Sequence, residues 1–557
     1  MLFGPAWQFL FLCLLGVSSL ITPGCKDNQT AGEKPGALSN SADRYGGTYR
    51  KPLQLEPLTL DPAFLTETHA ATVAQQVFDG LVQFDSDLNI LPSMARSWVS
   101  SRDGLRWTFY LQQGVKFHHG REMTAEDFVY TFTRLLHPQT ASPRAWLFDR
   151  IQGAKRFLAG QAPHVEGLRA LDAYTLEITL EQPYAPFISL LGMPQATVVP
   201  REEVERLGTD FGHQPVGTGP FRFVQWIQGK EIVLEANPAY SEGKPFLDRI
   251  VYRIQPDHQA LFTEFAQGLL EDSGLTELQR SPEPADAHFL LLRKPLLATL
   301  FLSMNTEHPP LNDRRVRQAI NHAINRQVIN ATIRHNQHLQ ARGILPRGMP
   351  GYNPEAIDYP YDPALARRLL AEAGYSAEHG FPRIELWTSV KTATAVLENE
   401  AVQRDLAQVG IPVEIYTAEN WQQFKTKVLG KRPGAMYRHA WYADFPDPDN
   451  VLYTLFHSQS ANNYTRYNNP DIDRLLEAAR SESDYLARVK SYRHIEALIM
   501  ADAPTVNLVY YTFGYLFQSY IRGIELNALG ERHIPMKKIW LDVTHRVATT
   551  PSSAKGP

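Results

Sequence analysis

Apolar residues recur along the chain with two different spacings. Every second residue is apolar over 105–111 and over 176–180, which predicts two half-buried strands, because successive strand side chains point to opposite faces. Over 313–333 the spacing is helical, so these apolar residues should share one helix face: Val316, Ala319, Ile320, Ala323, Ile324 and Val328. Strands and helices interspersed in this way predict an α/β fold.

Three more helices are predicted from the signals at their ends. Thr124-Ala125-Glu126-Asp127 resembles a capping box and should begin a helix that stops near Pro138. Asp362-Pro363 should begin a helix that ends at Gly374, since proline is tolerated in a first turn and glycine favours the position past the end. Asn469-Pro470 should begin the third helix.

The segment 1–25 has the features of an export signal. Its apolar run, 10–17, is shorter than the about 20 residues that span a membrane. The run is followed by Gly24-Cys25, which resembles the lipidation site of a lipoprotein, although the two residues before it depart from the usual pattern. We expect signal removal and lipidation at Cys25, with ordinary secretion as the alternative, and therefore a place in the periplasmic space or at the cell surface.

Composition narrows the class of protein further. The chain has two cysteines, and Cys13 would leave with the signal, so the mature protein would have no disulfide, thiol metal cluster or catalytic Cys–His pair. Its 55 Lys and Arg against 59 Asp and Glu, without a long basic block, argue against nucleic-acid binding. We expect a flexible tether at 26–44, two or three lobes in the body, and a disordered tail at 546–557.

Motifs of hydrolases and phosphate-binding proteins are missing from the sequence. It contains no H-E-x-x-H, no G-x-S-x-G and no P-loop. Gly217-Thr218-Gly219-Pro220 is followed by no Lys and predicts a tight turn before a strand at 221–223. His118-His119 favours a loop over a metal site, because adjacent strand residues point to opposite faces. We expect no catalytic residues, no resident metal and no cofactor.

The candidate chemistry lies in the segment 441–450, Trp-Tyr-Ala-Asp-Phe-Pro-Asp-Pro-Asp-Asn. A carboxylate beside aromatic rings suits a ligand's ammonium group, which gains both a charge pair and cation–π attraction. Asp444 should be partly buried and should need a cationic partner, and the residues alone leave a ligand and an internal salt bridge equally open. We expect Asp447 and Asp449 instead to begin a helix that carries Leu452, Leu455 and Phe456.

This segment is accompanied by further landmarks in a fixed order along the chain. They include Gly46-Gly47-Thr48-Tyr49, Leu60-Asp61-Pro62, Phe78-Asp79-Gly80-Leu81, Gly114-Val115-Lys116-Phe117-His118-His119-Gly120, Pro215-Val216-Gly217-Thr218-Gly219-Pro220-Phe221 and Asn237-Pro238-Ala239-Tyr240. From about Tyr45 to Asp542 the chain resembles the peptide-binding family of ABC-transporter substrate-binding proteins, solute-binding family 5. It departs from the family pattern at Gly268-Leu269-Leu270-Glu271-Asp272, where Gly-Glu-Ile-Asp is usual.

The resemblance implies an α/β, two-lobed periplasmic-binding-protein fold of the class II type, with an extra subdomain inserted in the first lobe. Its boundaries place a discontinuous lobe I at 45–85, 212–302 and 516–545. The inserted subdomain covers 86–211, and lobe II covers 303–515. The resemblance also implies a monomer that contacts a membrane only through its lipid anchor and the transmembrane subunits of an ABC permease.

The implied function is capture of oligopeptides or dipeptides for that permease. Asp444 would bind the ligand's α-amino group, and the backbone of Ala440, Trp441 and Tyr442 would run beside the peptide like an added strand. Weaker expectations place a second set of residues around the ligand: Thr66, Glu67, Thr68, Tyr510, Tyr511 and Thr512. The alternatives are a non-peptide solute such as a nickel chelate, haem or a sugar, a peptide-sensing lipoprotein, and, least favoured, a secreted hydrolase.

Overall fold

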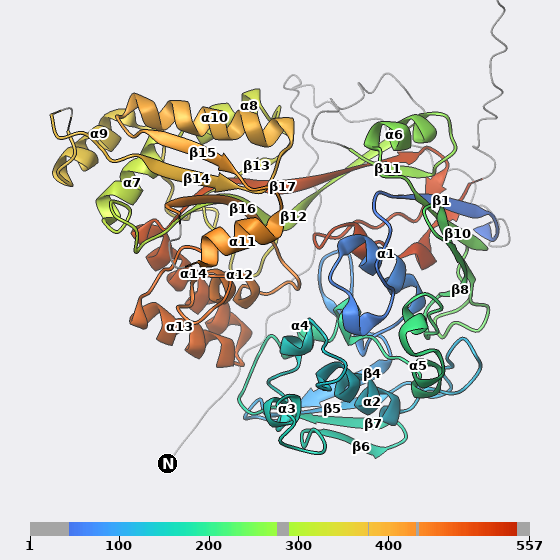
Figure 1. Cartoon of the computed structure of the whole chain (residues 1–557). Coiled ribbons are helices and arrows are strands. Elements are labelled where there is room, and N and C mark those ends of the chain that lie inside the picture. The colour runs from blue at the N-terminus through green and yellow to red at the C-terminus, as the bar shows by residue number, and fades with distance from the viewer. Residues whose placement is uncertain (1–43, 276–288, 377, 431–433, 543–557) are drawn as a thin grey trace, which may run out of the picture. The chain divides into compact units, whose positions relative to one another are not determined.

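The computed structural model describes residues 44–275, 289–376, 378–430 and 434–542 (Figure 1). The predicted signal peptide, the lipidation site Cys25, the tether up to residue 43 and the predicted tail at 546–557 lie outside the described residues. Within these ranges, no helix has both the length and the apolar character that a membrane crossing requires.

The first of three larger sheets combines distant parts of the chain. Its strand order is β1 (Thr48–Leu53), β10 (Arg249–Ile254), β9 (Glu231–Ala236) and β8 (Phe221–Ile227), with β1 and β10 parallel and the other pairs antiparallel. Helix α1 (Thr68–Val77) contributes its buried face to the same core, which also contains Tyr515 and Phe517 from near the end of the chain. β1 therefore depends on partners some 200 residues away, such as Arg249 opposite Thr48.

The second sheet is antiparallel and comes from one continuous stretch. Its order is β4 (Ala95–Ser100), β5 (Arg106–Leu111), β7 (Thr175–Thr179) and β6 (Leu168–Asp172). The helices of this stretch are α2 (Ala125–Leu136), α3 (Ala154–Leu158), α4 (Phe187–Leu190) and α5 (Arg201–Leu207). The alternation at 105–111 and 176–180 thus gives β5 and β7, and the predicted capping box at Thr124 and Asp127 is confirmed at the start of α2.

The third sheet contains the two longest strands, which run side by side (Figure 1). Its order is β11 (Asp272–Gly274), β17 (Thr505–Gln518), β12 (Phe289–Met304), β16 (Met436–Tyr442), β14 (Ile384–Thr388) and β15 (Val413–Thr417), with β13 (Leu339–Gln340) on β17. Its segment of the chain also forms α6 (His258–Ala266), α7 (Arg314–Ala323), α8 (Arg326–Thr332), α9 (Pro363–Glu372), α10 (Ala393–Gln408), α11 (Trp421–Leu429), α12 (Asp449–Phe456), α13 (Pro470–Ser481) and α14 (Tyr485–Asp502).

The prediction of one helix over 313–333 is wrong in one respect. The chain breaks after α7, and Asn325 caps a new helix, α8, by accepting the Val328 N–H at 3.1 Å. The new helix axis takes Val328 off the buried face, and it is 50% exposed. The helices predicted to begin at Asp362 and Asn469 are confirmed as α9 and α13, each with its cap residue bonded to the first turn.

Two loop predictions are also confirmed. The segment 217–220 is a loop that bends just before β8, where Gly217 and Gly219 lie so close to Val77 that a side chain at either position would overlap its backbone. His118 bonds to the carbonyl of Gly219 at 3.0 Å and His119 to the carboxylate of Glu202 at 2.7 Å, so the two imidazoles serve different neighbours. Within the described ranges, no group of three or more His, Cys, Asp or Glu side chains is placed to hold a metal ion.

Buried apolar residues form several cores with different chain origins. One core is built almost entirely from residues between 81 and 198, a second from 49–78, 199–254 and 515–541, and two more from residues between 297 and 529. The segments fall in the same order as the predicted inserted subdomain and lobes. The exact boundaries of those parts stay a prediction, because a core does not define where a lobe ends.

Candidate functional site

The candidate site is built around one end of β16. β14 pairs with β16 only at Met436 and Tyr437, whereas β12 pairs with it along its whole length. The N–H of Ala443 donates to the carbonyl of Leu297 at 2.8 Å, so in this antiparallel ladder every second residue turns toward β12. Ala440 is not one of the residues that turn toward β12. Its backbone N–H and C=O point to the side away from β12. That side of the strand has the hydrogen-bonding pattern that an added strand requires.

The same alternation separates the three residues predicted to contact a peptide through their backbone. Tyr442 turns its backbone to the same side as Ala440, and Trp441 turns its backbone toward β12. The indole of Trp441 is half-buried, and its Nε1–H donates to Asn450 Oδ1 at 3.2 Å. The ring of Tyr442 is 54% exposed and stacks on Tyr511, with ring centroids 5.4 Å apart.

Asp444 lies in the turn between β16 and α12 and is half-buried, as the sequence predicts. Its backbone N–H donates to Asn450 Oδ1 at 3.0 Å, the same oxygen that holds Trp441. In the part of the chain that the structure describes, its carboxylate makes no hydrogen bond and has no Lys, Arg or His nitrogen within 4.0 Å. The turn is thus fixed through its backbone N–H and not through the carboxylate.

An arginine from a distant part of the chain approaches this carboxylate. Arg532, in the short helix η6 (Glu531–His533), donates from Nη2 to the carbonyl of Ala443 at 3.0 Å. Burial lowers the pKa of the Arg532 guanidinium, and the negative charge of Asp444 acts in the opposite direction. Asp444 is therefore in the electrostatic range of one arginine without forming a salt bridge to it.

The segment 66–68 is connected to the same neighbourhood through a second arginine. Arg144 donates to the carbonyls of Leu65 at 3.1 Å and Thr66 at 3.4 Å, and its charge also lowers the pKa of Arg532. Glu67 precedes α1 and pairs with His69 at 3.0 Å, while α1 itself contacts η6. The structure therefore brings the predicted residues 66–68 near the environment of Asp444.

The three predicted residues on β17 have different surroundings. Tyr510 is 1% exposed and its hydroxyl donates to the carbonyl of Gly343 at 3.0 Å, so its side chain belongs to the core. Tyr511 is half-buried and faces Tyr442. The Thr512 N–H donates to His338 Nδ1 at 3.2 Å, and burial lowers the pKa of that imidazole to about 4, which keeps it neutral and able to accept.

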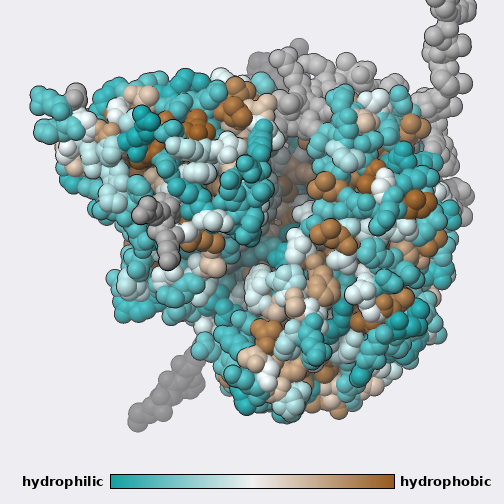
Figure 2. Space-filling model, viewed as in Figure 1, coloured by the Kyte–Doolittle hydropathy of each residue, from teal (hydrophilic) through white to brown (hydrophobic). Residues whose placement is uncertain are grey.

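A cavity of about 990 Å³ lies between the start of α1, the start of α10 and the strand β17. Of the predicted site residues only Thr68 lines it, together with residues that the sequence did not single out: Thr392, Thr394, Phe513, Tyr515 and Glu531. No local motif marks these positions, because they come from three separate segments. Figure 2 shows the molecular surface hollowed between the region of α11 and that of α1, with hydrophilic residues prominent on the α11 side.

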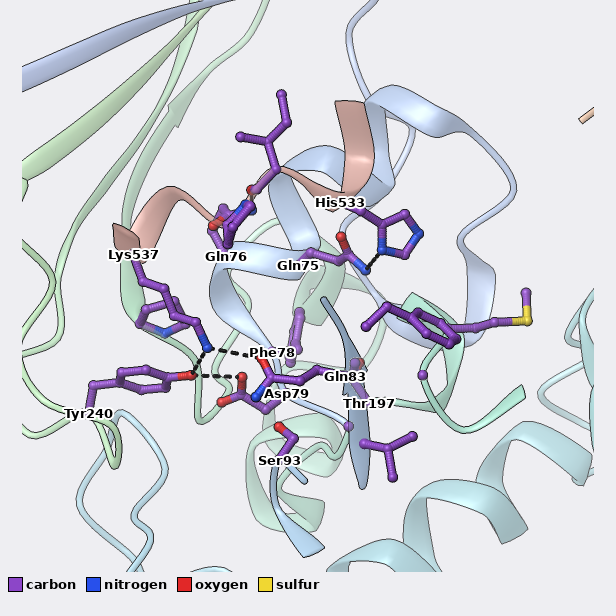
Figure 3. A pocket seen from close by; sticks show the side chains of 18 residues that line it. Gln75, Gln76, Phe78, Asp79, Gln83, Ser93, Thr197, Tyr240, His533 and Lys537 are labelled. Carbon is purple, nitrogen blue, oxygen red and sulfur yellow. Dashed lines mark hydrogen bonds between the residues drawn. The ribbon is translucent and has the colours of Figure 1, made fainter. Parts of the chain in front are cut away.

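A second cavity, of about 100 Å³, is too small for a peptide (Figure 3). There Lys537 Nζ donates to the hydroxyl of Tyr240 at 3.2 Å, and that hydroxyl donates to Asp79 at 3.3 Å. Burial raises the pKa of Asp79 to about 6 against the opposing charge of Lys537. Several polar side chains in this space bond to one another, but the buried Nε2 of His533, which also lines it, has no hydrogen-bond partner among the described residues.

Comparison with known proteins gives consistent matches over nearly all of the chain. The model for "Bacterial extracellular solute-binding proteins, family 5 Middle" matches residues 89–463. The dipeptide-binding protein of Escherichia coli (strain K12) is 29% identical over 486 residues, covering 82% of this chain and 88% of the relative. Heme-binding protein A of Haemophilus influenzae is also 29% identical, over 520 residues, covering 88% of this chain and 92% of the relative.

A solved structure with a bound peptide is similar in fold. The ABC transporter-associated periplasmic binding protein DppA from Helicobacter pylori, in complex with the peptide STSA, has a TM-score of 0.74 and 28% sequence identity. The match covers 90% of this chain and 99% of that chain. The names of these similar proteins state different solutes, so likeness alone does not choose among them.

Proposed function

Because the chain belongs to family 5 of the bacterial extracellular solute-binding proteins, we propose that its solute is a short peptide with a free amino terminus. The chain has the mixed α/β fold of the periplasmic binding proteins, as the sequence predicts. It is an extracellular or periplasmic solute-binding protein of an ABC transporter. Proteins of this family bind solutes without catalysis, so the hydrolase alternative is excluded.

The observation that carries the peptide proposal is the state of Asp444. A half-buried carboxylate without a salt bridge among the described residues lies at the end of a strand whose Ala440 turns its backbone away from β12. A peptide needs both features, since its ammonium group pairs with a carboxylate and its backbone extends a sheet. Main-chain bonding of this kind gives affinity that does not depend on the peptide's side chains.

We further propose that two lobes close over the ligand and that the closed form is the one delivered to the permease. Closure would remove water from the pair between Asp444 and the ligand's ammonium group and so strengthen it. The lobe boundaries and the lipid anchor at Cys25 belong to this proposal. Intact mass measurement of the membrane-bound protein and of its Cys25→Ser variant tests the anchor, because the lipid mass should be present only in the former.

Substitution of Asp444 by Asn tests the proposed ligand contact. We expect free-amine tripeptides to bind about 10- to 100-fold more weakly, since a hydrogen bond to a charged group contributes about 1.5–3 kcal/mol. The N-acetylated forms of the same peptides should bind the variant and the original protein alike. Titration calorimetry measures the dissociation constants of the free-amine and the N-acetylated peptides. Asp471→Asn, which changes an exposed aspartate of α13, is the matched control.

An equal loss for free and acetylated peptides would contradict the role of Asp444.

Native mass spectrometry of the purified protein addresses the alternative solutes directly. A family of short peptides with free N-termini supports the proposal, whereas a single bound haem or metal chelate overturns it. A bound haem or metal chelate has a physical basis in the structure, since His69 and His258 line the 990 Å³ cavity and one similar protein is named for haem.

A further inference from the structure

A buried ion pair lies behind the wall of the 990 Å³ cavity. Lys51 on β1 and Asp272 on β11 are each 1% exposed, and Lys51 Nζ lies 2.9 Å from Asp272 Oδ2. The hydroxyl of Tyr49 donates to the same oxygen at 2.6 Å. Asp272 is the last residue of the segment 268–272, whose sequence departs from the family pattern. The departure therefore includes a buried charged residue.

The network continues to the cavity through one tyrosine. Lys51 Nζ also donates to the Tyr515 hydroxyl at 2.8 Å, and that hydroxyl donates to Glu531 Oε2 at 2.9 Å. Because an ammonium group only donates, the single hydroxyl proton of Tyr515 is directed to Glu531. The two residues at the end of this chain of bonds, Tyr515 and Glu531, both line the cavity.

The charges of this network do not balance. One ammonium group faces two carboxylates, and within the described ranges Glu531 has no Lys, Arg or His nitrogen within 4.0 Å. Burial raises the pKa of Asp272, and repulsion from Glu531 adds to this effect. The neighbouring Arg532 is directed elsewhere, to the carbonyl of Ala443. One negative charge therefore remains at the cavity wall, on the half-buried Glu531.

Glu531 also retains hydrogen-bonding capacity. Its Oε1 has no hydrogen-bond partner among the described residues, and an ionised carboxylate accepts about four hydrogen bonds. The other acid of the wall, Asp257, caps α6 through Oδ1, which accepts from the N–H groups of Gln259 at 2.8 Å and Ala260 at 3.3 Å, and it is exposed to water whereas Glu531 is half-buried. No Lys or Arg belongs to the described lining of the cavity.

Aromatic rings stand beside this carboxylate. Phe513 and Tyr515 both line the cavity, with ring centroids 4.7 Å apart. Tyr515 already has Lys51 Nζ 4.7 Å from its ring centroid, so aromatic contact with a ligand's cation or the stem of a long side chain falls mainly to Phe513. Across the cavity lies the start of α10, whose N–H groups carry partial positive charge. One of them, the Ala395 N–H, already donates to Thr392 Oγ1 at 3.3 Å. The Glu531 side of the cavity is thus the one suited to a positive group.

We propose that this cavity receives a lysine or arginine side chain of the bound peptide and that Glu531 determines this specificity. The inference rests on the proposed function and deepens it by naming a class of peptide. Glu531 would act on side-chain choice, whereas Asp444 would act on the amino terminus. The two carboxylates therefore make separable contributions to binding.

The test uses tripeptides of alanine in which each position in turn carries lysine, arginine, norleucine or glutamate. We expect the original protein at pH 7 to bind the lysine or arginine peptide at least about tenfold more tightly than its norleucine counterpart at one position. In Glu531→Gln this preference should fall to about twofold or less, while binding of the norleucine peptide stays unchanged. Titration calorimetry measures all pairs, and Glu525→Gln, which changes a half-buried acid paired with Lys538, is the control.

The outcomes separate this inference from the proposal on which it rests. Binding of all the peptides without preference, or a preference that survives in Glu531→Gln, overturns the role of Glu531 and leaves the peptide function intact. Absence of binding for every peptide overturns the peptide function and this inference with it. Glu531→Ala provides a second variant with the same expected loss of preference, and its thermal unfolding shows that the fold is kept.

Discussion

Asp444 and Asp449 lie five residues apart and have opposite surroundings. Asp449 is buried at the start of α12, where Arg480 holds both of its oxygens at 3.1 and 2.8 Å. The hydroxyls of Tyr184 and Tyr492 add bonds at 2.9 and 3.2 Å. Asp444 has none of these contacts in the described structure and shares only a longer-range interaction with Arg532.

The difference follows from what packs on each residue. Asp449 lies where α12 meets α13 and α14, so its charge is removed from water and requires an arginine. Asp447 is also buried and forms a salt bridge with Arg488. Asp444 lies just past the end of β16, where its carboxylate has no hydrogen bond and no Lys, Arg or His nitrogen within 4.0 Å among the described residues. One short segment therefore contains two acids with buried arginine partners and one without a salt bridge among the described residues, which is the acid that we propose binds the ligand.

The largest expected effect is from Asp449→Asn. The change leaves the Arg480 guanidinium buried without its counter-ion, and loss of one partner of a buried pair costs about 3–5 kcal/mol. We expect a reduction of that size in the free energy of unfolding, measured by urea denaturation. A loss below about 1 kcal/mol would mean that Asp449 is not a structural anchor and would remove the contrast with Asp444.

A third buried carboxylate sharpens the comparison because, among the described residues, no Lys, Arg or His nitrogen lies within 4.0 Å of it. Glu496 on α14 accepts the N–H groups of Ile344 at 2.7 Å and Leu345 at 2.8 Å, and burial raises its pKa from the usual 4.5 to about 7. Between these values the folded chain binds more protons than the unfolded chain, so this group destabilises the fold as pH rises. The contribution is about 3 kcal/mol, at about 1.4 kcal/mol per pH unit.

The variant Glu496→Gln removes this titration. We expect the free energy of unfolding of the original protein to fall more steeply between pH 4.5 and pH 7 than that of the variant, as followed by urea denaturation at several pH values. Glu372→Gln, an exposed acid of α9, should leave the slope unchanged. Parallel pH profiles for Glu496→Gln and the original protein would show that Glu496 is ionised throughout this range.

The smallest expected effect on stability is from Asp444→Asn. The carboxylate has no salt bridge among the described residues, so the free energy of unfolding without ligand should change by no more than about 0.5 kcal/mol. The same urea experiment measures it beside Asp449→Asn. A large destabilisation would indicate that the interaction with Arg532 is structural, and the internal salt bridge left open by the sequence would then be the better account.

Much of the local structure is determined by short sequence patterns. Thr124 and Asp127 form their capping box, Asn469 and Asp362 cap their helices, and the alternation at 105–111 gives β5. These features depend on residues within a few positions of one another, so their physical causes are visible in the sequence. The ordered landmarks also identify the family, and through it the fold, without any knowledge of long-range contacts.

The tertiary structure decided the features that depend on distant partners. The helical spacing at 313–333 does not show that the chain turns at Asn325, and the sequence alone could not choose between a ligand and a salt bridge for Asp444. Glu531 was missed because its environment comes from Lys51 and Tyr515, which are 464 positions apart. A carboxylate's role is set by the charges within a few ångströms, and only folding brings those together.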